Sequence, residues 1–102
     1  MEPPIACSLG AADLEQRLAD WQRLFATIAP EATRVDTTTL SVRVNVNEEQ
    51  LTTLAGLAHA EAECCPFFRF AIEIDARSTT FVVSVPADAA SVLDDFAQLL
   101  LQ

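Results

Sequence analysis

The chain has 102 residues and a formal charge of −9, from 15 acidic and 6 basic side chains. This length predicts a single domain over residues 1–102, and the 51% hydrophobic content provides a compact core and excludes a disordered chain. The acidic balance argues against direct contact with nucleic acid or with an anionic membrane surface. Three cysteines are too few for a secreted disulfide scaffold, and no export signal or long apolar run is present. We therefore expect a cytoplasmic protein with reduced thiols.

The spacing of apolar residues predicts three helices. The first helix covers Ala11–Ala29, with Ser8 as its candidate N-cap, and its apolar stripe consists of Leu14, Leu18, Trp21, Phe25 and Ile28. The second begins after Asn47, with Gln50 completing a capping box, and it ends before Pro66. Its predicted inner stripe is Leu51, Leu54, Ala55, Ala58, Ala62 and Cys65. Pro86 opens the third helix, in which Ala89, Leu93, Phe96, Ala97 and Leu100 face the core.

Alternating apolar and polar residues predict strands between these helices. The predicted strands are residues 40–46, 68–76 and 79–85, with a short partner at 33–36 and a further short strand at 5–8. Residues 68–76 and 79–85 form a hairpin with its turn near Arg77 and Ser78. Because each strand is polar on one face, we predict an α+β domain, with a mostly antiparallel sheet of three to five strands and three helices packed on one face.

The most unusual segment runs from Glu61 to Phe70 and contains two adjacent cysteines. Glu61 lies three and four residues before Cys64 and Cys65, so its carboxylate can reach the helix edge where both sulfurs emerge. The single histidine, His59, lies on another side of the helix and is expected to pair with Glu63. This segment is the candidate site for chemistry.

The surroundings of the cysteines disfavour a nucleophilic thiol. Both sit at a helix C-terminus beside Glu61 and Glu63, and each of these features raises a thiol pKa, while Arg69 alone opposes them. A dithiol of the thioredoxin type requires two intervening residues, and a disulfide between adjacent cysteines is strained. An enzyme with Glu61 as general base and Cys64 as nucleophile is a third option, and on balance we do not expect an enzyme.

A soft metal or metalloid ion brings its own charge to the thiols and is favoured by the surrounding carboxylates. We therefore predict a site for Hg(II), Cu(I) or As(III) formed by Cys7, Cys64, Cys65 and Glu61. Zn(II) is the weaker choice because it prefers four ligands. The alternative is that the cysteines pack as small apolar side chains, which we favour for Cys65 and weigh equally for Cys64. The clustered phenylalanines and Trp21 are assigned to the core.

The segment resembles a family of small bacterial proteins of unknown function that carry a Glu-x-x-Cys-Cys-Pro-Phe motif. The motif residues here are Glu61, Cys64, Cys65, Pro66 and Phe67, with Phe70 closing the motif. The N-terminal Ile-x-Cys-x-Leu pattern of that family is similar to Ile5, Cys7 and Leu9. Members occur near, or joined to, regulators of the mercury-resistance type, so the resemblance implies heavy-metal handling.

Two functions from different classes follow. The first is a cytoplasmic thiol protein that binds a soft ion for sequestration, delivery or sensing. The second is a non-catalytic interaction module with structural cysteines. Leu99 and Leu101 lie outside the core stripe of the last helix. We weigh two explanations of this apolar edge equally: a wide core-facing stripe or frayed last turn, and a surface for a homodimer through the C-terminal helix or for docking on a transcriptional regulator.

Overall fold

The computed structural model describes the backbone of residues 11–99 and the side chains of residues 16–98. The elements in chain order are α1 (Ala11–Phe25), β1 (Glu31–Asp36), β2 (Thr39–Val44), α2 (Glu48–Cys64), β3 (Arg69–Ile74), β4 (Thr79–Ser84), a 3₁₀ turn (Ala87–Ala89) and α3 (Ala90–Leu99). This arrangement confirms the predicted α+β fold. The strand predicted at residues 5–8 and the Ser8 cap lie outside the described residues. Between residues 11 and 99, no helix is long and apolar enough to cross a membrane.

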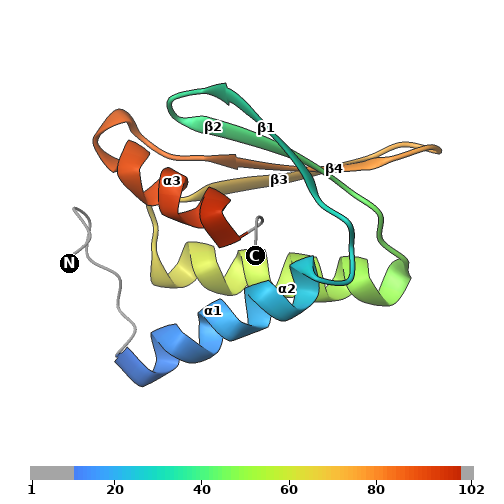
Figure 1. Cartoon of the computed structure of the whole chain (residues 1–102), viewed down its shortest axis with the longest axis horizontal. Coiled ribbons are helices and arrows are strands. Elements are labelled where there is room, and N and C mark those ends of the chain that lie inside the picture. Colours follow the sequence, from blue (N-terminus) through green and yellow to red (C-terminus); the bar gives the residue numbers. More distant parts are fainter. Residues whose placement is uncertain (1–10, 100–102) are drawn as a thin grey trace.

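The four described strands form one antiparallel sheet in the order β1-β2-β4-β3. Each hairpin contributes one inner and one edge strand, and β2 pairs with β4 in the centre. Helix α2 carries the chain from β2 to the opposite edge of the sheet. All three helices lie on the same side of the sheet, so the other face is left uncovered by helices (Figure 1).

Helix α1 presents a buried face to the sheet through Trp21 and Phe25, and Ile28, just beyond the helix, is also buried; all three are at most 3% exposed. The helix ends at Phe25 rather than at the predicted Ala29. The chain then turns at Ala29, whose φ of 47° lies in the left-handed region. Ala29 precedes Pro30, and the residue before a proline is kept out of the right-handed helical conformation. Leu18, predicted on the inner stripe, is 39% exposed. The buried face is therefore rotated away from Leu18.

Helix α2 begins as predicted, because Asn47 and Gln50 form both hydrogen bonds of a capping box. The helix ends at Cys64, and Cys65 is the C-cap, whose φ of −125° and ψ of 83° lie outside the helical region, as expected before Pro66. The predicted inner stripe is partly wrong. Ala55 is exposed, while the buried residues of α2 are Leu54, Ala58, Glu61 and Cys64. The inner face of α2 therefore includes the carboxylate of Glu61, where the prediction had placed only apolar residues. The partners of Glu61 lie on α1.

The β3–β4 hairpin turns where expected, because the Asp75 carboxylate accepts hydrogen bonds from the backbone N–H groups of Arg77 and Ser78. After Pro86 the chain forms a 3₁₀ turn before α3, in which Leu93 and Phe96 are buried as predicted. The predicted apolar edge formed by Leu99 and Leu101 lies outside the described side chains. An ion pair of 2.6 Å between Arg34 and Asp94 joins β1 to α3.

Candidate functional site

The adjacent cysteines lie at the end of α2, and both are part of the hydrophobic core. Cys64 is 8% and Cys65 4% exposed, and their Sγ atoms are 3.5 Å apart. This distance is well beyond a disulfide bond of about 2.05 Å, so the two sulfurs are not joined to each other. Cys65 carries a free thiol, whereas Cys64 is disulfide-bonded. The prediction of reduced thiols therefore fails at Cys64, and Cys7 lies outside the described residues.

Glu61 is the single buried charged residue among those described, at 7% exposed. Its Oε1 atom accepts a hydrogen bond of 2.9 Å from Trp21 Nε1 and lies 3.6 Å from Arg17 Nη1. Within the described residues, Arg17 Nη1 is buried without a hydrogen-bond partner. Helix α1 thus holds the carboxylate from two successive turns, since Arg17 and Trp21 are four residues apart.

Sequence reasoning missed both of these partners. It gave no role to Arg17, and it assigned Trp21 to packing alone. The Arg17 side chain is in fact 17% exposed and points toward Glu61. The signal that could have revealed the contact is the indole N–H of Trp21, because a buried indole requires an acceptor. Glu61 was the motif residue able to supply it.

The pKa of the Cys65 thiol is raised to about 12, first by burial and then by the negative charge and hydrogen bond of Glu61, while the Arg17 charge opposes them. The direction agrees with the prediction for this helix end. The causes differ, because desolvation comes first and the opposing cation is Arg17 rather than Arg69. A thiol of this kind is a poor nucleophile at neutral pH, since the thiolate is the reactive form.

The aromatic residues around the pair belong to the core, as predicted. Phe81 is fully buried, and Phe68 and Phe96 are at most 8% exposed. The Trp21 ring stacks on Phe25 at 5.4 Å and meets Phe96 edge-on at 5.1 Å. These contacts fix the indole in the position from which it reaches Glu61.

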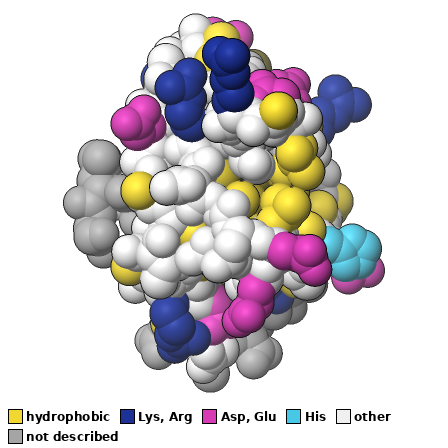
Figure 2. All heavy atoms as spheres, turned by 90° about the vertical axis from the view of Figure 1, so that its right-hand side faces the viewer, with side chains coloured by type: hydrophobic (Ala, Val, Ile, Leu, Met, Phe, Trp, Pro, Cys, Tyr) yellow, Lys and Arg dark blue, Asp and Glu magenta, His cyan; other side chains and the backbone are white. Residues whose placement is uncertain are grey.

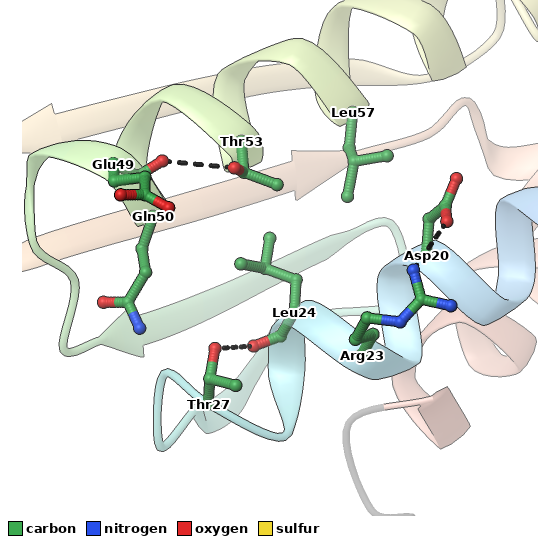
Figure 3. Close-up of a pocket in the computed structure, with 8 residues that line it drawn as sticks. All are labelled: Asp20, Arg23, Leu24, Thr27, Glu49, Gln50, Thr53 and Leu57. Atoms are coloured by element: carbon green, nitrogen blue, oxygen red, sulfur yellow. Dashed lines mark hydrogen bonds and ion pairs between the residues drawn. The ribbon is translucent and has the colours of Figure 1, made fainter.

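Within the part of the chain that the structure describes, two surface hollows lie away from the cysteines. One, of about 450 Å³, opens between α1 and α2 and is drawn in Figure 3. Its lining residues are Asp20, Arg23, Leu24, Thr27, Glu49, Gln50, Thr53 and Leu57. Polar side chains of the lining form hydrogen bonds within their own helix: Arg23 donates to Asp20 in α1, and Thr53 donates to the backbone carbonyl of Glu49 in α2. The hollow therefore shows no group of convergent, unpaired polar side chains.

The second hollow, of about 290 Å³, lies between α2 and β3 and is mostly apolar. It is lined by Ala55, Ala58, His59, Ala62, Phe70 and Ile72. Figure 2 shows hydrophobic side chains gathered beside the histidine on this side of the molecule. His59 Nε2 lies 3.3 Å from Glu63 Oε1, which confirms the predicted pairing and leaves the histidine apart from the cysteines.

Among the described residues, no group of three or more histidine, cysteine, aspartate or glutamate side chains is arranged to hold a metal ion. The structure places Cys65 beside Cys64 and beside Glu61, and it places the partners of Glu61 on α1. Comparison of the sequence with models of protein families gives no match, and comparison with curated proteins gives none either.

Proposed function

We propose that the reduced protein binds a thiophilic metalloid, trivalent arsenic, through Cys64 and Cys65, with Cys7 as the third ligand. The observation that carries the proposal is the 3.5 Å separation of the two Sγ atoms. The Cys64 disulfide must first be reduced, so the proposal concerns the thiol form of the protein. The protein would sequester, deliver or report the ion.

The sulfur separation discriminates among the soft ions. If both sulfurs stood about 2.3 Å from one ion, a separation of 3.5 Å would give an S–ion–S angle of about 100°. This angle suits a pyramidal three-coordinate centre such as As(III). A linear two-thiolate site, which Hg(II) and Cu(I) favour, would require sulfurs about 4.6 Å apart at the same bond length. Zn(II) would in addition require a fourth ligand.

Proton balance favours the same ion. Arsenous acid, As(OH)₃, condenses with a thiol to form an As–S bond, and the thiol proton leaves with one hydroxyl as water. Three thiols therefore release three waters without a change in charge or oxidation state. A metal cation instead requires a free thiolate, which the raised pKa of Cys65 opposes. A buried pair that contains the high-pKa thiol of Cys65 is thus better suited to arsenous acid than to a cation.

Glu61 has a different role in this proposal from the ligand role suggested by its spacing. Its Oε1 atom is held by Trp21 and Arg17, and it hydrogen-bonds with the Cys65 thiol. Arg17 also offsets the negative charge that would otherwise attract a cation. Glu61 therefore acts as the acceptor that orients the Cys65 thiol, and we do not count it among the ligands.

The test is intact-mass spectrometry of reduced protein incubated with arsenite, with Hg(II) and Zn(II) in parallel. Binding by three thiols adds one arsenic atom and removes three hydrogens, whereas binding by two leaves one hydroxyl and a product heavier by one water. We expect the three-thiol product, formed with little dependence on pH between 6 and 8. Cation binding should strengthen as the pH rises, because it releases protons.

The single variants Cys7→Ser, Cys64→Ser and Cys65→Ser identify the ligands. Loss of either member of the adjacent pair should abolish the adduct, while Cys7→Ser should give the two-thiol product. Glu61→Gln serves as the matched control and should retain the stoichiometry. The proposal is wrong if the reduced protein forms no adduct, or if the Cys64→Ser, Cys65→Ser double variant still forms one.

The second candidate is a non-catalytic interaction module, with a transcriptional regulator or a second copy of the chain as partner. Its support is the membership of Cys64 and Cys65 in the hydrophobic core cluster. An aromatic disulfide reagent separates the two candidates. In native reduced protein, full protection of both thiols together with failure to bind arsenite would favour the module, and rapid modification of both would favour the ion site.

A further inference from the structure

Strand β3 is an edge of the sheet, and β4 is its one strand neighbour among residues 11–99. Its register with β4 is regular over all six residues, so its outer side presents an uninterrupted row of backbone groups. Such an edge readily accepts another strand. The opposite edge, β1, is protected by a register shift between Arg34 and Asp36, and Arg34 is bound to Asp94 and to two nearby carbonyls.

The side chains of β3 add an apolar surface to this open edge. Phe70 and Ile72 are half-buried and line the hollow against α2, and Ile74, on the same face, is 63% exposed. The α2 side of the hollow consists mainly of alanines, which allow another chain to approach closely. Figure 2 shows this surface as the group of hydrophobic side chains beside His59.

We propose that a second copy of this chain docks on β3, so that the two β3 strands pair antiparallel about a twofold axis at Ala71. The two sheets then form one continuous sheet with both helix layers on the same side. Phe70 lies opposite Ile72 of the partner subunit, which joins the two apolar surfaces. An isologous contact of this kind closes at two copies.

Charge complementarity on β3 identifies the second copy as the occupant. Arg69 and Glu73 are exposed and stand two residues on either side of Ala71. In the proposed register Arg69 lies opposite Glu73 of the partner subunit, and the symmetry forms this pair twice. Opposite charges directly across two strands stabilise the pairing, whereas like charges oppose it.

Other registers lose this match. Moving the axis to Ile72 places Glu73 opposite Ala71 of the partner subunit, so its charge has no cross-strand partner. Placing the axis between two residues would pair side chains from opposite faces, and the helix layers would then lie on opposite sides of the sheet. The register centred on Ala71 is therefore the one that satisfies both charges and joins both apolar surfaces.

The test measures the mass of the full-length protein in solution by sedimentation equilibrium over a range of concentrations. We expect a dimer whose dissociation constant rises at least about tenfold in R69E and in E73R, because each variant places like charges opposite each other twice. The double variant R69E/E73R should restore the dimer, since the pairs re-form with reversed sign. Arg43→Glu, an exposed charge reversal on the inner strand β2, is the matched control and should stay dimeric.

The two single variants also control for the net charge of −9. R69E makes the chain more acidic and E73R makes it less acidic, so a general charge effect would move their dimerisation in opposite directions. A monomeric wild-type protein overturns the proposal. A dimer that neither reversal weakens also overturns it, as does a double variant that stays monomeric while circular dichroism shows it folded.

Discussion

The contact between Trp21 and Glu61 gives the sharpest stability prediction. Both groups are buried, at 1% and 7% exposed, and the Nε1–Oε1 distance is 2.9 Å. A hydrogen bond to a charged group contributes about 1.5–3 kcal/mol to the free energy of unfolding. We therefore expect a coupling energy of about 2 kcal/mol between the two side chains, measured in a double-mutant cycle.

The cycle uses Trp21→Phe, which removes the donor, and Glu61→Met, which removes the acceptor at similar length. Trp21→Phe also loses ring contacts with Phe25 and Phe96, and Glu61→Met also removes the ion pair with Arg17. These additional losses occur in both arms of the cycle and cancel in the coupling energy. In a domain of this size, about 2 kcal/mol corresponds to a shift in Tm of roughly 8–16 °C.

The assay is urea unfolding followed by far-ultraviolet circular dichroism, because tryptophan fluorescence is lost in two of the four proteins. All four must share one slope against urea concentration, so that each midpoint converts to a free energy. The Cys64 disulfide is kept in one redox state throughout. A coupling energy below about 0.5 kcal/mol would refute the view that the Trp21–Glu61 hydrogen bond stabilises this core.

Three further predictions concern single positions. Because the pKa of Cys65 is raised, the unfolded chain loses a thiol proton between about pH 9 and 12 that the folded chain keeps. The free energy of unfolding therefore falls as the pH rises through this range, by at most about 1.4 kcal/mol per pH unit. Urea midpoints across this range should show the fall, and Cys65→Ala should lack this part of it. Gly56→Ala should stabilise the protein by about 1 kcal/mol, because Gly56 is inside α2 and an added Cβ meets nothing within 4 Å. Thermal unfolding measures the effect, and an unchanged Tm would contradict this prediction. Asn47→Ala should destabilise it by about 1 kcal/mol through loss of the α2 cap, whereas the exposed Asn45→Ala should have little effect.

Local patterns predicted most of the fold. The capping box of Asn47 and Gln50, the termination before Pro66 and the alternation in β2 and β4 each depend on neighbours a few residues apart, and each is confirmed. The end of α1 at Phe25 was missed, since apolar spacing continues to Ile28 although the chain has already left the helix. Ile28 is fully buried although it lies beyond the end of the helix, so the apolar pattern alone could not locate that end.

The candidate site was predicted less completely, because its decisive contacts join residues far apart in sequence. Spacing placed Glu61 near both cysteines, and its effect on Cys65 agrees with that. It could not show that Trp21, forty residues earlier, donates to the same carboxylate. Helical spacing on α2 also favoured Ala55 and Ala62 over Glu61 for the inner face, since a carboxylate is buried only where a partner on another element compensates its charge.

Strand β1 is exposed at all six positions, and it is attached to the molecule mainly by its pairing with β2 and by the Arg34–Asp94 contact. Segments with so little buried area open more often than the core, without global unfolding. When β1 detaches, the next strand becomes the new edge, and its alternating Leu40, Val42 and Val44 carry the buried face of the sheet. The bulged outer strand therefore protects the inner strand β2 against intermolecular aggregation.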